Sequence, residues 1–197
     1  MRYDAAHKEK TRKRVLKVAA KAIRTQGPHR VAVAGVMAKA GMTHGGFYVH
    51  FASKDAFLAA TVDHMFIDGF GQVLPNMEAR DPAEALRIYI DWYLSPAHRD
   101  NRSQGCPLPY LVADAPRLPK AARRRVAQGM EELRQAIARK VAGLGLPKAD
   151  AEAQSIVAAL VGAIALARAE PDRQLSDRIL ADTHGALMRR LGLQSPH

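Results

Sequence analysis

The sequence predicts an all-α protein with a helix-turn-helix near its N-terminus. Hydrophobic residues make up 48% of the chain but aromatic residues only 6%, as in alanine- and leucine-rich helical proteins. Apolar residues recur at helical spacing through most of the chain, and no stretch shows the strict alternation of a half-buried strand. Glycine and proline residues separate the helical stretches. At 197 residues, the chain is long enough for one or two small domains.

The first helix is predicted to begin near Thr11, where the periodic pattern starts. Val15 and Ile23 then fall on one face, and basic residues cover much of the rest. Gly27 and the proline after it end the helix. Residues 1–10 are polar, so we expect a loose basic arm that could contact phosphates.

A helix-turn-helix is predicted for residues 33–51. The pattern indicates a short helix over 33–40, and Gly41 supplies the turn. Thr43 is the predicted N-cap of the next helix, over 44–51, because its hydroxyl can accept a hydrogen bond from an unpaired backbone N–H.

This second helix of the motif contains Gly45 and Gly46, each of which costs about 1 kcal/mol relative to alanine in a helix interior. Two explanations are open. The glycines could let the helix approach bases and phosphates closely, or they could permit a tight crossing against the first helix. We favour the first, because a crossing needs one small residue rather than two. Phe47 and Phe51 are predicted to be buried. The residues expected to face outward, and therefore candidates for DNA binding, are His44, Tyr48 and His50.

Charge is distributed unevenly along the chain. Residues 1–54 hold twelve Lys and Arg against two Asp and Glu, whereas residues 55–197 hold eighteen against seventeen. Nearly all of the formal net charge of +11 therefore lies on the segment that contains the helix-turn-helix. A basic segment of this kind is suited to an anionic duplex, and double-stranded DNA is the predicted partner.

The start of the next helix shows a second sign of an anionic partner. Ser53 is a predicted N-cap, and Asp55 complements the helix dipole. Lys54 lies at the end of the helix where a cation is mildly unfavourable, which is explained if a phosphate binds there. The alternative is a solvated surface lysine.

The rest of the chain is nearly neutral and helical, and nothing in it indicates a membrane span. The longest apolar run, Ile156–Ala167, has twelve residues, whereas a span needs about twenty. Cys106 is the single cysteine, so an intrachain disulfide is excluded and a reducing cytoplasm is the expected location. The predicted helices of this region cover residues 54–72, 82–95, 118–143, 149–168 and 174–191.

Residues 41–57, Gly41-Met-Thr-His-Gly-Gly-Phe-Tyr-Val-His-Phe-Ala-Ser-Lys-Asp-Ala-Phe57, closely resemble the signature of the tetracycline-repressor (TetR) family of bacterial regulators. The family pattern is glycine, hydrophobic, serine or threonine, any residue, glycine, then a hydrophobic-tyrosine pair; an aromatic residue and Ser-Lys-Asp/Glu follow. The chain departs from the family at Val33, where a threonine usually caps the second helix and contacts a phosphate. Arg30 is a candidate to replace that contact.

The resemblance implies a homodimer with a DNA-binding domain at residues 1–54 and an effector-binding and dimerisation domain at residues 55–197. By analogy, Thr43, Tyr48 and Lys54 bind phosphates, while His44 and Gly45 approach base edges. Phosphate contacts supply affinity and position, and base contacts supply sequence preference. A two-fold dimer presents its recognition helices about one helical turn apart, so a near-palindromic operator is expected. The expected mechanism is repression relieved by a small-molecule effector, although the same residues are compatible with an activator.

Two sets of residues in the C-terminal domain are candidates for dimerisation and effector binding. For both, the alternative is an ordinary intrachain core. Family members pair their last two helices with those of a second copy, and the apolar stripes here suit that role; the candidate interface residues are Ile156, Leu160, Ala163, Ile164, Ile179, Leu187 and Leu191. An apolar or aromatic effector would suit the candidate pocket residues Phe66, Phe70, Tyr89, Trp92, Tyr93, Cys106, Tyr110 and Met130.

Cys106 supports an alternative hypothesis, a repressor that senses oxidants or electrophiles. It lies in a Gly-Cys-Pro segment near a predicted helix start, where the helix dipole could lower the pKa of its thiol. Some family members sense electrophiles through a cysteine in a similar segment. The alternative is a small buried residue with an inert thiol.

Other classes of protein fit the sequence less well. His64 and Asp68 share a helix face, but there is no third metal ligand at a telling spacing, no glycine-rich phosphate loop and no nucleophile beside an obvious base. We therefore expect no enzymatic activity, no metal and no cofactor. A non-specific architectural nucleic-acid binder is the rival of another class; it would leave the near-neutral C-terminal domain without a role.

Overall fold

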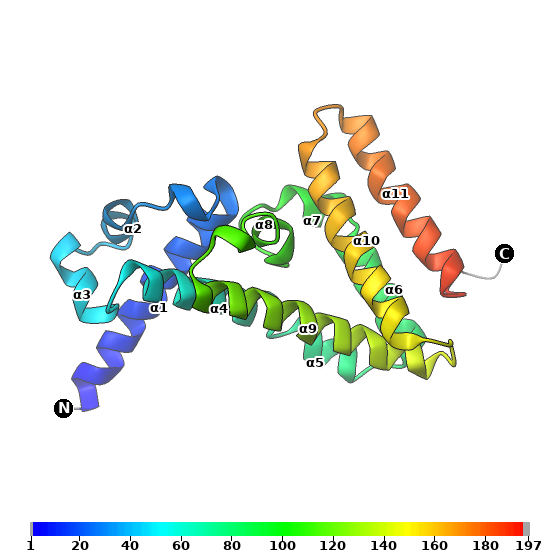
Figure 1. The fold of residues 1–197 in the computed structure, drawn as a ribbon, viewed down its shortest axis with the longest axis horizontal. Helices are drawn as coiled ribbons and strands as arrows, with labels where there is room; N and C mark the ends of the chain where they lie inside the picture. Colours follow the sequence, from blue (N-terminus) through cyan, green and yellow to red (C-terminus); the bar gives the residue numbers. More distant parts are fainter. Residues whose placement is uncertain (1, 195–197) are drawn as a thin grey trace.

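The computed structural model describes residues 2–194, with side chains from residue 6 onward. Every regular element in this part of the chain is helical, which confirms the all-α prediction. We call α1–α3 the head and α4–α11 the body; the head lies at one end of the molecule, and the body extends from it to the other end (Figure 1). The helices are α1 (Arg2–Gln26), α2 (Val33–Lys39), α3 (Phe47–His50), α4 (Lys54–Phe70), α5 (Val73–Glu78), α6 (Pro82–Tyr93), α7 (Pro96–Asp100), α8 (Leu108–Leu111), α9 (Lys120–Gly143), α10 (Ala149–Ala169) and α11 (Arg173–Arg190), with 3₁₀ turns η1 (Pro28–Arg30), η2 (His44–Gly46) and η3 (Ala115–Arg117).

The five longer helices of the body lie where the sequence predicts them, as α4, α6, α9, α10 and α11. No residue range was predicted for the short helices α5, α7 and α8, although a helix start was expected near Cys106. Each has at most six residues, which is too short for a period of 3.6 to become visible in the apolar pattern.

The expectation of a loose arm at residues 1–10 is wrong, because α1 already begins at Arg2. The segment contains neither glycine nor proline, and its alanine, lysine and glutamate residues have high helix propensity. Glu9 and Lys13 add an ion pair one turn apart, at 4.0 Å. On the inner face of α1, Val15 and Ile23 are buried as predicted.

Three aromatic rings join the head to the start of α4. Phe47 and Phe51 are both 3% exposed, which confirms their predicted burial. Phe57, from α4, packs edge-on against both, with ring centroids 5.5 and 5.0 Å away. Gly41 has φ +68°, a left-handed conformation that favours glycine, and it makes the turn before η2. Helix α4 therefore begins within the core of the head and continues into the body.

The body is built on α4 and α9, which run side by side along its length (Figure 1). At Gly129 of α9, a side-chain carbon would collide with the Phe66 ring of α4, so these helices cross closely there. Helix α10 packs on α9, and α11 runs antiparallel to α10 and packs on α10 and α6 (Figure 1). Among the described helices, only α10 has the length and composition of a membrane span, and a core helix passes the same test.

Candidate nucleic-acid interface

The outer end of the head is formed by η2 and α3, and it exposes the polar residues that the sequence selects. Thr43, His44 and Gly45 are exposed, and the Tyr48 side chain is 70% exposed. Thr43 occupies the cap position, but its hydroxyl accepts no capping bond, so its predicted capping role is wrong. The chain first makes a 3₁₀ turn, closed by the Gly46 N–H donating to the Thr43 carbonyl at 3.1 Å. The hydroxyl is left available to an external partner.

Packing within the chain does not explain the two glycines of this segment. A side-chain carbon at Gly45 would meet nothing within 4 Å. At Gly46 it would make ordinary contacts, the nearest with Met42 at 3.5 Å. The tight-crossing explanation therefore loses its basis, and the absence of side chains keeps the exposed backbone at Gly45 open to close approach from outside.

Val49 also belongs to this surface, although the sequence analysis missed it. Its side chain is 60% exposed beside Tyr48, an unusual position for two large apolar residues. A valine in this place can contact the methyl group of thymine in a major groove. Its exposure could have been predicted from its position next to Tyr48, off the buried face defined by Phe47 and Phe51.

His50 lies partly inward rather than fully outward. It is half-buried, and its Nδ1 is buried with no partner in the described part of the chain. Burial lowers the pKa of its ring, and the neighbouring cations Lys8 and Arg12 lower it further. Both cations come from α1, which therefore adds positive charge near this end of the head.

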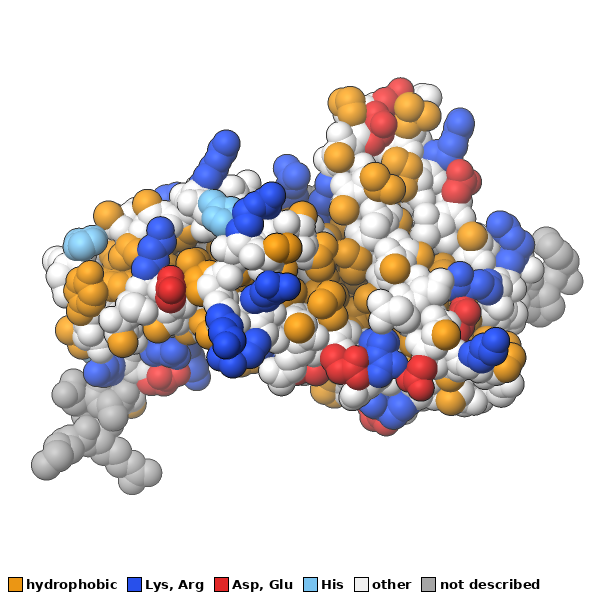
Figure 2. Space-filling view, in the orientation of Figure 1, with side chains coloured by type: hydrophobic (Ala, Val, Ile, Leu, Met, Phe, Trp, Pro, Cys, Tyr) orange, Lys and Arg blue, Asp and Glu red, His pale blue; other side chains and the backbone are white. Residues whose placement is uncertain are grey.

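Two more of the predicted DNA contacts, Lys54 and Arg30, are exposed cations. Lys54 is exposed at the first position of α4. The Ser53 hydroxyl accepts a hydrogen bond from the Ala56 N–H at 3.0 Å, which confirms the predicted cap. Arg30 is exposed in η1. Helix α2 starts without a side-chain cap: its N-cap residue is Ala32, and Val33 is its first helical residue. On the face shown in Figure 2, acidic side chains lie mainly over the body.

An apolar pocket of about 250 Å³ lies between α5 and α6. Two of the eight candidate effector-binding residues, Tyr89 and Trp92, line it. The lining residues on the α5 side could not be selected because α5 itself was not predicted, whereas Ala85 and Ile88 lie on the predicted α6 and were not selected. The remaining lining residues are Gln72, Val73, Asn76, Met77, Arg80, Ala85 and Ile88.

Six of the candidate pocket residues lie elsewhere, and their assignment to one pocket with Tyr89 is corrected. Core packing explains four of them, which are at most 5% exposed: Phe66, Phe70, Tyr93 and Cys106. Tyr110 is half-buried under the Arg168 guanidinium, whose central carbon lies 4.2 Å from the ring centroid. Met130 is 39% exposed on α9.

The Cys106 thiol is 1% exposed, and its burial raises its pKa to about 11. The expectation of a lowered pKa is therefore wrong. Helix α8 has only four residues and begins two positions later, so its dipole does not offset the cost of burying a thiolate. In this conformation Cys106 is a protonated, inaccessible thiol.

Most of the candidate interface residues are already buried within the single chain, so their assignment to a surface between two copies is corrected. On α10 they face α9 and the neighbouring helices of the body rather than the outside. The buried ones, at most 5% exposed, are Ile156, Leu160, Ala163, Ile164, Leu187 and Leu191, while Ile179 is half-buried. The outer faces instead expose Leu166 of α10, at 62%, and Leu175 of α11, at 45%.

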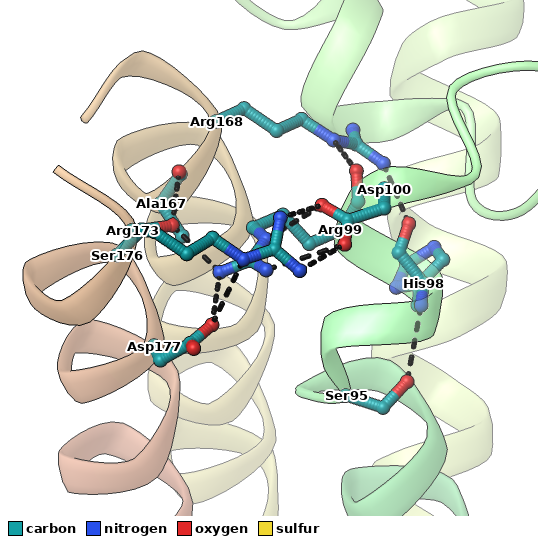
Figure 3. A network of polar contacts seen from close by, with 9 residues as sticks. All are labelled: Ser95, His98, Arg99, Asp100, Ala167, Arg168, Arg173, Ser176 and Asp177. Carbon is teal, nitrogen blue, oxygen red and sulfur yellow. Dashed lines mark hydrogen bonds and ion pairs between the residues drawn. The ribbon is translucent and has the colours of Figure 1, made fainter. Parts of the chain in front are cut away.

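A polar network fastens the α10–α11 pair to α7 (Figure 3). The buried Arg99 donates to the Ser176 hydroxyl at 2.7 Å and pairs with Asp177 at 2.5 Å. Arg168 donates to the backbone carbonyls of Arg99 and His98, at 3.0 and 3.1 Å. The His98 ring stacks on Trp92, with centroids 4.5 Å apart. The network thus connects the last two helices to a wall of the apolar pocket.

Comparison with known proteins agrees with this arrangement. Residues 15–61 match the family described as bacterial regulatory proteins of the tetR family. Residues 82–181 match the C-terminal domain of LmrA/YxaF-like transcriptional regulators. The chain belongs to the TetR family of bacterial transcription regulators, a family of DNA-binding proteins. No curated protein sequence matches it significantly.

Solved structures share the fold over nearly the whole chain. The reduced form of NemR from E. coli has a TM-score of 0.80 at 17% identity, over 91% of this chain and 96% of NemR. A TetR regulator from Chloroflexus aurantiacus has a TM-score of 0.80 at 24% identity, over 96% and 98% of the two chains. One from Agrobacterium tumefaciens has a TM-score of 0.77 at 22% identity, over 96% and 100%.

Proposed function

We propose that this protein is a cytoplasmic, ligand-responsive repressor that binds a near-palindromic DNA operator as a homodimer. Residues 1–54 supply the DNA-binding domain and residues 55–197 the effector-binding and dimerisation domain. The observation that carries the proposal is the surface formed by the exposed residues of this segment, in which Gly45 has no role in packing within the chain; the exposed residues are Thr43, His44, Gly45, Tyr48 and Val49. His44, Gly45 and Val49 face the bases.

In this arrangement the phosphate contacts surround the segment that reads the bases. Thr43, Tyr48 and Lys54 bind phosphates, and Arg30 takes the place of the missing threonine at position 33. These groups set affinity and position on the duplex, whereas the base contacts set preference.

The proposed effector is a small apolar or aromatic molecule that binds between α5 and α6. The pocket of about 250 Å³, with Tyr89 and Trp92 in its wall, supports this assignment. Because α5 follows α4 directly and α4 starts in the core of the head, an occupant that displaced α5 would tilt α4 and change the spacing of the two heads. The proposed dimer uses the exposed faces of α10 and α11, including Leu166 and Leu175.

The structure does not favour the cysteine-sensing alternative. A buried thiol with a raised pKa is a poor nucleophile, because the thiolate is the reactive form. We therefore keep the apolar effector as the proposed signal. A Cys106→Ser variant that bound operator normally but ceased to respond to electrophiles would reverse this preference.

Selection of bound duplexes from a randomised pool tests the proposal and separates it from its rival. We expect a near-palindromic consensus, with two half-sites about one helical turn apart. Affinity for this consensus is then compared with affinity for random DNA at the same salt concentration. A ratio near one would favour a non-specific architectural binder and overturn the repressor.

A further inference from the structure

A second pocket, polar and about 220 Å³ in volume, lies between α1 and α4 at the junction of the head and the body. It shares no lining residue with the apolar pocket between α5 and α6. Its wall comes from three separate stretches of the chain. The lining residues are Lys17, Ala20, Lys21 and Arg24 of α1, His64 and Asp68 of α4, and Ser103 and Gln104 of the segment between α7 and α8.

Arg24 is buried in this junction pocket, yet its hydrogen-bonding capacity is poorly used. The residue is 5% exposed. Its Nη2 lies 3.4 Å from the Asp68 carboxylate and 3.5 Å from the Met65 carbonyl, and its Nη1 lies 3.4 Å from the Ser103 carbonyl. Good bonds of this type measure about 2.7–3.2 Å. Nε is buried and has no partner in the described part of the chain.

A buried charge with weakly bonded donors is costly, since each donor has lost its water. Burial is also the main cause of the lowered pKa of Arg24. An acceptor inside the pocket would relieve this cost, because a guanidinium carries five N–H donors arranged to grip two oxygen atoms.

The charge of the lining shows which kind of acceptor fits. Lys17 and Lys21 are exposed at the rim, while Asp68 is the one carboxylate among the described residues that line the pocket. With Arg24, the wall therefore has three cations and one anion. A water molecule could satisfy Nε, but it would leave the excess of positive charge unanswered. An anion with two or more oxygen atoms would accept a hydrogen bond from Nε and also neutralise the excess positive charge.

We propose that the junction pocket binds a small oxyanion, either a carboxylate or a phosphate group, through Arg24 and Lys21. An occupant would contact α1, α4 and the Ser103–Gln104 segment together, so it would tie the head to the body and change operator affinity. The site goes beyond the proposed function, because its ligand is anionic and its pocket is distinct from that of the apolar effector.

Calorimetric titration of the DNA-free protein with inorganic phosphate, and separately with acetate, tests the site. Each anion replaces chloride at constant ionic strength, and the stronger of the two identifies the class. We expect saturable binding that Lys21→Gln weakens roughly tenfold to a hundredfold, since hydrogen bonds to charged groups are worth about that much. Lys13→Gln is the matched control, on the same helix with its side chain 70% exposed, and should leave binding unchanged.

Arg24→Lys provides a second variant that keeps the charge and removes the forked donors. If it melts like the wild type, its oxyanion affinity should also fall. Absence of saturable binding for both anions would overturn the site, as would an equal loss in Lys21→Gln and Lys13→Gln. Operator affinity in phosphate and in chloride, at equal ionic strength, should differ for the wild type but not for Lys21→Gln. Equal values for the wild type would overturn the coupling. The titration uses no DNA, so its failure leaves the repressor proposal standing.

Discussion

Gly105 lies directly against the ring of His98: a side-chain carbon at position 105 would come within 2.5 Å of the histidine Nε2. His98 is 4% exposed, and its Nδ1 bonds to the Tyr93 carbonyl at 2.7 Å. The glycine also has φ +91°, which L side chains rarely adopt. These two residues hold the loop between α7 and α8 against α6.

Gly105→Ala should therefore destabilise the protein by more than backbone strain alone, by about 2–4 kcal/mol in total. Gly145→Ala is the matched control, because Gly145 has φ +73° but no atom within 4 Å of the added carbon. It should cost about 1 kcal/mol. Urea unfolding of both variants measures the difference, and equal losses would show that contact with His98 is unimportant.

Acidification should weaken the fold through His98. Burial lowers the pKa of its ring to about 4, from about 6.5 in an unfolded chain. Between these values the unfolded state binds more protons, so stability is complete above pH 6.5 and falls as the pH drops toward 4. The loss attributable to this residue is about 3 kcal/mol.

Unfolding free energies between pH 4 and pH 7 test this effect. His98→Gln, which cannot titrate, should flatten the slope. His44→Gln, at an exposed histidine that forms no ion pair within the described part of the chain, is the matched control and should leave the slope as it is. An unchanged slope in His98→Gln would assign the pH dependence to other groups.

Gly45→Ala should fold normally and bind operator poorly. An added methyl meets nothing within the chain, so stability should remain the same or rise by up to about 1 kcal/mol. On DNA, the methyl would stand between the backbone and the base edges, and we expect a loss of roughly tenfold or more. Gly35→Ala, an equally unobstructed position in α2, is the control. If Gly45→Ala bound operator with wild-type affinity, close approach of DNA would not explain the glycine at this position.

Lys54→Ala should weaken binding about equally on all DNA sequences and reduce the salt slope by roughly one unit, because one phosphate contact is lost. Affinities on the selected operator and on random DNA, across a range of salt concentrations, supply the measurement. Lys120→Ala, at the start of α9 in the body, should change neither quantity. A slope unaltered by Lys54→Ala would make that lysine a solvated surface residue.

The sequence predicted the architecture well because long amphipathic helices repeat their apolar pattern over several turns. The helix-turn-helix was equally predictable from the sequence, because Gly41 marks the turn and Phe47 and Phe51 mark the buried face. The pocket in the body was much harder to predict from the sequence. Pocket-lining and core side chains are the same residue types. Tyr89 lines the pocket because it faces α5, a helix that was not predicted, whereas Phe66 is buried in the core.

Three further misses have physical causes. Helix α10 has the predicted apolar stripe, but the sequence pattern does not show whether the stripe packs within the chain or against a second copy. In the structure, Ile156 and Leu160 are buried within the chain. For Cys106, the sequence indicated a helix start but not the depth of burial, and burial determines the direction of the pKa shift. The junction pocket escaped notice because Arg24 and Ser103 lie far apart in sequence.

The position of Phe57 restricts how the head can move. Its ring completes an aromatic cluster with Phe47 and Phe51, while Phe66, further along the same helix, is wedged against Gly129. Helix α4 is continuous between Phe57 and Phe66, so it moves as a rigid unit and the head moves with it. A fragment cut before Phe57 would leave two phenyl rings facing water, and the excised head should be a poorly folded peptide rather than an autonomous DNA reader.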